Sequence, residues 1–235
     1  MDMVRKGVFF FLLTLLLSGV QAQGLKYNES RTVGSFNQID VCCGIQVFIT
    51  EGSSNKIRVE TNDEEMLKQI VTEAKNNRLK IGFESSFGKR PRNLKVNVYM
   101  EAKGLREIEA SSGSDVQSQT RLIADEIALS SSSGSDIRIE LEANKLSCRS
   151  SSGSDIKLSG KALFATVHAS SGSDIHMRDM EVESVEASAS SGSDISLYVT
   201  KELEAKASSG ADIQYKGNPG TVNRKVSSGG SVRQQ

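Results

Sequence analysis

Six aspartates recur at nearly equal intervals through the second half of the sequence, and their carboxylates are the groups best placed to do chemistry. Each ends a Ser-Ser-Gly-Ser-Asp motif, which relaxes to Ser-Ser-Gly-Ala-Asp in the sixth copy. Oxygen atoms are the ligands that Ca²⁺ takes in proteins, and repeats rich in glycine and aspartate bind calcium between the turns of some solenoids. One hypothesis is therefore a calcium-binding row. It consists of Asp115, Asp136, Asp155, Asp174, Asp194 and Asp212.

Two other interpretations of this row remain open. An Asp beside a Ser-Gly turn can accept hydrogen bonds from nearby backbone N–H groups, so it can recur simply because the turn recurs. Paired carboxylates also hydrolyse glycosidic bonds, which would make the chain a polysaccharide-active enzyme. Against the enzyme, the chain after residue 22 has no Trp, four Tyr and five Phe, which are few aromatic rings for a sugar-binding groove.

Nucleophilic catalysis has little support in the sequence. Gly-x-Ser-x-Gly is absent, and only His168 and His176 offer an imidazole base. Both fall in polar rows of the repeat, where a solvated surface histidine is expected. They flank one turn, so an approach close enough to share a metal is an alternative. We assign no catalytic and no cofactor-binding residue.

The chain has three cysteines. Adjacent residues on a strand point to opposite faces, so Cys42 and Cys43 are not expected to pair with each other. Cys148 falls in an apolar row and is expected to be a small core residue. A disulfide from Cys148 to Cys42 or Cys43 in an oxidising compartment remains an alternative. The spacing does not match a zinc site.

The aspartates recur because the chain repeats. The glycines of the motif are separated by 21, 19, 19, 20, 18 and 19 residues. Apolar and polar residues alternate on both sides of each glycine, which indicates two short half-buried strands per repeat. A unit of this size is stable only when it is stacked on copies of itself. The glycines are Gly113, Gly134, Gly153, Gly172, Gly192, Gly210 and Gly229.

We therefore predict an all-β chain whose residues 105–235 form a single-stranded β-helix, or β-solenoid, with rungs of ~19 residues. The row three residues after each glycine, from Val116 to Val232, should point inward. The glycines should adopt a left-handed backbone conformation. Neighbouring aspartates in the outward row would lie about 4.8 Å apart and repel by roughly 1 kcal/mol even in water. The last repeat, which lacks the Asp, should cap the open sheet edge.

Residues 23–104 are also β-rich but less regular. Gly44 has apolar residues at the same offsets as the later glycines, so this part can be continuous with the solenoid. Asn76-Asn77 is typical of a tight hairpin turn. Residues 63–70 are predicted to form a short helix with Asn62 or Asp63 as its N-cap, and residues 85–93 a basic loop.

Residues 1–22 have the pattern of a secretory signal peptide. Arg5 and Lys6 precede an apolar stretch at residues 8–17, and Val20-Gln-Ala22 supplies small residues for cleavage. An uncleaved N-terminal anchor is the alternative. We expect an exported protein that resides in the periplasm, at the outer membrane or at the cell surface. No second long apolar stretch follows, so no transmembrane span is expected in the mature chain.

The charge balance argues against one class of partner. The whole chain has 29 basic and 29 acidic residues, and removal of Arg5, Lys6 and Asp2 with the signal peptide leaves 27 and 28. A nearly neutral chain without a basic block is not expected to bind nucleic acid.

The segment from Gly34 to Gly52, GSFNQIDVCCGIQVFITEG, is followed downstream by serial Ser-Gly-Ser-Asp-Ile units. This combination resembles the putative auto-transporter adhesin head GIN domain family over nearly all of the mature chain. The resemblance implies an exported bacterial envelope protein with a β-helical fold. It suggests adhesion through the family's name and supplies no catalytic residue. Cys42-Cys43 stand where small Ser or Gly residues are usual in that family.

From these observations we expect an exported, non-enzymatic envelope or surface protein. It would be an adhesin or binding scaffold that presents a Ser/Asp-lined face of its solenoid to a surface ligand or an envelope component. One alternative is a calcium-dependent binding solenoid, and another is a polysaccharide-active β-helix enzyme. The discriminating observations are a calcium-dependent melting temperature and two carboxylates facing each other in a deep groove.

Overall fold

The computed structural model describes residues 25–84 and 91–235, so the predicted signal peptide lies outside the described residues and the predicted basic loop lies mostly outside them. Nearly all regular structure in the described part is β. The elements are β1 (Tyr27–Thr32), β2 (Gln38–Val41), β3 (Gln46–Glu51), β4 (Lys56–Thr61), α1 (Glu64–Leu67), β5 (Ile70–Lys75), β6 (Arg78–Phe83), β7 (Val96–Ala102), β8 (Glu107–Ser111), β9 (Asp115–Ser118), β10 (Leu122–Ser132), β11 (Asp136–Ser151), β12 (Asp155–Ser170), β13 (Asp174–Ala189), β14 (Asp194–Ala207), β15 (Asp212–Lys216), β16 (Thr221–Val226) and β17 (Ser231–Gln234).

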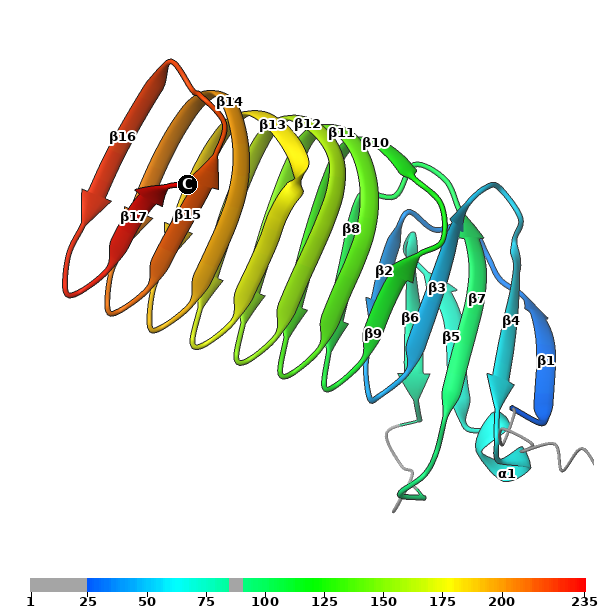
Figure 1. The fold of residues 1–235 in the computed structure, drawn as a ribbon. Coiled ribbons are helices and arrows are strands. Elements are labelled where there is room, and N and C mark those ends of the chain that lie inside the picture. Colours follow the sequence, from blue (N-terminus) through cyan, green and yellow to red (C-terminus); the bar gives the residue numbers. More distant parts are fainter. Residues whose placement is uncertain (1–24, 85–90) are drawn as a thin grey trace, which may run out of the picture.

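Each repeat forms one coil of a parallel β-solenoid (Figure 1). One strand runs into the Ser-Gly turn, and the next strand leaves the turn on the other side of the core. Successive coils pair in parallel, so that β11 lies between β10 and β12. The long strands β11 to β14 curve round the edge opposite the turns. The predicted β-solenoid is therefore confirmed.

The solenoid has two outward faces. Face A contains the strand segments that precede the turns, and face B contains those that follow them. We call the edge with the Ser-Gly turns the sharp edge and the opposite edge the rounded edge. In stacking order, face A consists of β5, β6, β2, β8, the ends of β10 to β14 and β16. Face B consists of β1, β4, β7, β3, β9, the beginnings of β11 to β14, β15 and β17.

The row after each aspartate forms the centre of the core, as predicted. Each of its side chains is paired in register with the corresponding residue of the next coil and is buried. Burial of one such aliphatic side chain contributes roughly 1.5–3 kcal/mol. The row consists of Val116, Ile137, Ile156, Ile175, Ile195, Ile213 and Val232.

The sharp edge is built from turns in which two consecutive residues have positive φ. In the first copy φ is 56° at Ser112 and 72° at Gly113, as a type I′ turn requires. The left-handed glycine was predicted, but the left-handed serine before it was not. The N–H of Gly113 donates to the carbonyl oxygen of Ser133 in the next coil at 3.1 Å, which continues the ladder round the edge.

In the five Ser-Ser-Gly-Ser-Asp copies, the serine before the aspartate stabilises the turn from within. Ser135 is fully buried, and its Oγ accepts from the N–H of Ser132 at 3.0 Å and donates to the carbonyl oxygen of Ala110 at 2.8 Å. The aspartate one residue later points outward. Its carboxylate contacts the next coil, as when Asp174 Oδ1 accepts from the N–H of Asp194 at 3.1 Å. Asp174 thus accepts a backbone N–H of the next coil, whereas the serine before the aspartate bonds within the turn.

The first strands stack on the repeats out of chain order. β2 and β3, which flank Gly44, pair in parallel with β8 and β9 on one side and with β6 and β7 on the other. The coil formed by β6 and β7 therefore lies on the N-terminal side of the coil formed by β2 and β3. After β7 the chain passes the coil of β2 and β3 and continues with β8 on its other side. Gly44, whose apolar neighbours match those of the later glycines, also has a left-handed conformation with φ 77°.

Antiparallel strands end the stack on the N-terminal side. β4 pairs with β7, β1 with β4, and β5 with β6, all antiparallel. Asn76 and Asn77 both have positive φ and form the predicted hairpin turn. α1 is shorter than the helix predicted for residues 63–70, and the side chain of its N-cap Asp63 accepts from the N–H of Met66 at 3.1 Å.

An arginine lies across the core at each end. Arg31 of β1 stands in an inward row and donates to the carbonyl oxygen of Leu67 at 2.8 Å. Arg224 of β16 pairs with buried Ala205, and its guanidinium lies 5.3 Å from the ring centroid of Tyr215. Inward-pointing charges discourage the addition of another strand at an open sheet edge. These arginines therefore help to cap the stack, in line with the atypical terminal repeat.

Candidate binding surfaces

The six aspartates form one continuous row on face B beside the sharp edge. Each is in register with the aspartate of the next coil, from Asp115 through Asp155 to Asp212. All six are partly or fully exposed. The predicted residues are thus brought together in a line. Within residues 25–84 and 91–235, no group of three or more His, Cys, Asp or Glu side chains is arranged to hold a metal ion.

Carboxylates in the row destabilise one another. Partial burial raises the pKa of Asp155, and the charges of Asp174 and Asp136 raise it further. Burial likewise raises the pKa of Asp194, with added repulsion from its two neighbours in the row. Near the beginning of the row the repulsion is relieved, because Arg138 Nη2 lies 2.7 Å from Asp136 Oδ2.

This repulsion predicts that Asp155→Asn and Asp194→Asn stabilise the protein at neutral pH. A raised pKa in the folded state means that stability increases as the pH falls from 7 through that pKa, and is lost again as the pH rises. Each substitution should contribute up to about 1 kcal/mol at pH 7, and its advantage should shrink towards pH 4. Asn keeps the oxygen that accepts from the next coil. Thermal melts at pH 7 and pH 4 test this.

Asp136→Asn is the matched control, because it removes the partner of Arg138 and should not stabilise. If all three variants melted alike, repulsion within the row would not be the cause.

A second outward row runs beside the aspartates, two residues further along each strand. It carries aromatic side chains on β7 and β3 and basic side chains on β11 and β12. Phe48 and Tyr99 stack with ring centroids 4.9 Å apart, and the guanidinium carbon of Arg58 lies 4.6 Å from the Tyr99 centroid. The position of Phe48 between the inward residues Val47 and Ile49 is the sequence pattern that indicates its outward orientation. The row consists of Arg58, Tyr99, Phe48, Gln117, Arg138, Lys157, His176, Ser196 and Gln214.

The two histidines do not meet. His168 pairs with Ser188 on face A, and His176 pairs with Lys157 on face B. The buried core lies between the two faces, so the alternative of a shared metal is wrong. Burial lowers the pKa of His168, and the nearby charge of Arg149 lowers it further.

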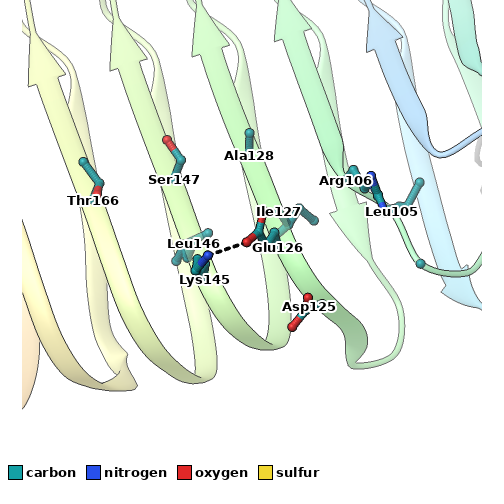
Figure 2. Close-up of a pocket in the computed structure, with 11 residues that line it drawn as sticks. Leu105, Arg106, Asp125, Glu126, Ile127, Ala128, Lys145, Leu146, Ser147 and Thr166 are labelled. Atoms are coloured by element: carbon teal, nitrogen blue, oxygen red, sulfur yellow. Dashed lines mark hydrogen bonds and ion pairs between the residues drawn. The ribbon is translucent and has the colours of Figure 1, made fainter.

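Face A carries a hollow of about 580 Å³ towards the rounded edge. Figure 2 shows Ala128, Ser147 and Thr166 along it on three successive strands, β10, β11 and β12. An ion pair lies beside them, with Lys145 Nζ 2.5 Å from Glu126 Oε1. The segment that crosses from β7 to β8 lines one end of the hollow. Its surface therefore combines small and hydroxyl side chains with charges of both signs.

The family described as "Putative auto-transporter adhesin, head GIN domain" matches residues 35–219. The chain belongs to this family. Its matched region includes the turn at Gly44 and every copy of the motif that carries an aspartate. The recognition made from the segment at Gly34–Gly52 and the downstream repeats is thus confirmed.

Solved structures show the same head GIN fold. A putative adhesin from Bacteroides fragilis is 22% identical, with 89% of this chain and 96% of that chain covered and a TM-score of 0.81. A putative lipid binding protein from Parabacteroides distasonis is 18% identical, with 89% and 96% covered and a TM-score of 0.72. A putative adhesin from Parabacteroides merdae is 21% identical, with 89% and 95% covered and a TM-score of 0.71. No curated protein matches the chain. At these identities the likeness establishes the fold.

The prediction that Cys42 and Cys43 do not pair with each other is wrong for this head GIN domain. Cys42 and Cys43 are joined by a disulfide, although their alternation on a strand argued against it. β2 ends at Val41, and Cys43 has φ 76°, so it takes the place of the left-handed serine in the turn. Gly82 of β6 lies against the pair, since a Cβ there would stand 2.9 Å from Cys42 Sγ.

Cys148 is free and buried in an inward row, as expected. Desolvation raises the pKa of its thiol well above the ordinary range. The alternative bridge from Cys148 to the other cysteines is therefore wrong. Among the helices of the described residues, none is long and apolar enough to cross a membrane.

Proposed function

We propose that this head GIN domain is an exported, non-enzymatic surface protein that adheres to a partner through the Ser/Asp-lined side of its solenoid. Family membership supports adhesion, since the family and several solved relatives are described as putative adhesins. The partner would be a ligand outside the cell or a component of the envelope.

The observation that carries this proposal is the row of carboxylates, which is only partly neutralised by neighbouring cations. Partial burial, followed by repulsion from neighbouring aspartates, raises the pKa values of Asp155 and Asp194. The parallel row beside the aspartates holds the basic side chains of Arg138 and Lys157. The aspartate row offers a carboxylate at each of six successive coils, with a basic side chain beside it in two of them, to an extended or repeating partner. Binding would offset the repulsion that the fold alone does not relieve.

Export is tested first, in the bacterium that produces the protein. Whole cells are treated with protease, fractions are blotted for the chain, and a periplasmic enzyme serves as the control for leakage. Cleavage in intact cells supports surface exposure. Recovery of an uncleaved chain from the cytoplasm contradicts export.

Adhesion is tested with beads that carry the purified chain from residue 23. We expect the beads to adhere to whole bacteria of the producing strain or to an epithelial cell layer. A variant with Asp136, Asp155, Asp174 and Asp194 all replaced by Asn should lose most of this adherence while it melts no lower than the parent. Beads that adhere to neither surface, or equally well with the variant, contradict the proposal.

Calcium binding by the aspartate row is the second candidate, favoured by the same accumulation of negative charge. On this candidate, millimolar Ca²⁺ relieves the repulsion and raises the melting temperature, and a chelator reverses the rise. The variant with four Asn residues should not respond. An unchanged melting temperature of the parent protein in calcium and in chelator removes this candidate.

A further inference from the structure

Phe164 is a large apolar side chain on the outside of face A. It is 55% exposed, although it belongs to the long strand β12. It stands at the end of face A that meets the rounded edge, two residues before Thr166, which lines the hollow. A phenylalanine at this position contributes little to the core. Its ring is therefore available for contact with a ligand.

The neighbouring coils leave the Phe164 ring accessible. Phe164 is paired with Lys145 on one side and with Ser184 on the other. Lys145 is drawn away towards the preceding coil by its ion pair with Glu126 at 2.5 Å. Ser184 is too small to cover an aromatic ring. The ring is thus an open apolar platform beside the hollow.

Polar groups of several kinds surround this platform on the same face. Outward positions along a strand are roughly 6.6 Å apart and neighbouring coils about 4.8 Å apart, so side chains of three coils form a regular grid. The grid offers hydroxyl groups, a carboxylate, an imidazole and a guanidinium within a small area. It consists of Lys145, Ser147 and Arg149 in β11, Phe164, Thr166 and His168 in β12, and Ser184, Glu186 and Ser188 in β13.

The charges of this area balance. Arg149 and Glu186 carry opposite charges on strands two coils apart, and the ion pair of Lys145 with Glu126 is internally neutral. The residues that line the hollow also include the oppositely charged Arg106 and Asp125. Burial and the charge of Arg149 lower the pKa of His168, which disfavours the charged form of its imidazole. The six charged side chains of the grid and the hollow, three of each sign, therefore sum to zero.

We infer that Phe164 and the hollow beside it form a binding site for an uncharged saccharide chain. The apolar face of one sugar ring would stack on Phe164, and its hydroxyl groups would bond with Thr166 and Glu186. Further sugar residues would lie in the hollow over Ser147 and Ala128. An aromatic platform beside a few polar groups of both donor and acceptor type is the composition expected of a small-molecule site.

This site lies on face A, on the opposite side of the core from the aspartate row of face B. It therefore does not depend on the function proposed above. The variant with four Asn residues in that row should bind saccharide as well as the parent does, even where it no longer adheres.

The test uses the mature chain and tetrasaccharides of glucose, mannose, galactose and N-acetylglucosamine, with titration calorimetry and saturation-transfer NMR. We expect at least one of them to bind and to place a sugar ring against a Phe resonance. Phe164→Ala should weaken that binding at least tenfold, and Phe164→Tyr should retain it. Leu163→Ala, the exposed neighbour at the bend, should leave it unchanged.

Phe164→Ala should keep the parent melting temperature, because the ring is mostly exposed. A loss of binding with an unchanged melt therefore reports the contact itself. Binding by none of the four sugars, or equal binding by Phe164→Ala, overturns the inference. If a tetrasaccharide that contains uronate bound much more tightly than all four neutral ones, the inference that the ligand is uncharged would be wrong.

Discussion

Ile156→Asp should abolish the cooperative melting of the mature chain or lower its melting temperature by roughly 10–20 °C. Ile156 is completely buried and pairs with Ile137 in the preceding coil and with Ile175 in the following one. The substitution removes roughly 1.5–3 kcal/mol of apolar burial and adds a carboxyl group that finds no partner there. The total loss of unfolding free energy, about 5 kcal/mol, places Ile156→Asp among the most damaging single substitutions.

Lys157→Asp is the control for this prediction. Lys157 is the next residue along β12, but its side chain lies on the outside of face B. A charge reversal there should change the stability by less than about 1 kcal/mol. If Ile156→Asp and Lys157→Asp lost similar amounts of stability, the assignment of inward and outward rows would be wrong. Both proposed binding surfaces, the aspartate row and the site at Phe164, depend on that assignment.

Gly160→Ala should destabilise the protein far more than Gly153→Ala. Gly160 has φ 113°, and a Cβ on it would lie 2.0 Å from the carbonyl oxygen of Leu141, its partner in the preceding coil. That oxygen belongs to backbone, so β11 and β12 would have to separate. We expect a loss of several kcal/mol, of order 3 or more.

Gly153→Ala differs because the turn at Gly153 is open. Its φ is 66°, and no atom lies within 4 Å of an added Cβ. The cost there is that of a left-handed alanine, roughly 1–2 kcal/mol. Chemical denaturation of the two variants beside the parent measures both losses. Equal losses would show that the two coils are not as close at Gly160 as the structure places them.

The two proposed binding surfaces arise from the stacking of coils in different ways. Because coils repeat at a fixed spacing, one exposed residue type becomes a row, and two such rows become a patterned face. The aspartate row is made by repetition. The site at Phe164 is made by a departure from repetition, since the corresponding positions in neighbouring coils are Lys145 and Ser184.

Local patterns determined the repeat unit of this protein. Alternation around each glycine is a property of consecutive residues, so the inward row at Ile156 and the outward row at Asp155 could be read from the chain. The left-handed glycine follows in the same way, because a tight turn between two strands demands it. The match of Gly44 to the later glycines also rested on local spacing.

The tertiary structure alone decided which segments are neighbours across the stack. No local pattern shows that β2 and β3 lie between coils that the chain forms later, or that Gly160 faces the backbone of Leu141. The bond between Cys42 and Cys43 arises because the turn at Gly44 interrupts the strand. Exposure of Phe164 depends on where the coil bends. Side-chain alternation is set along the chain, whereas these features depend on how distant segments close around a common core.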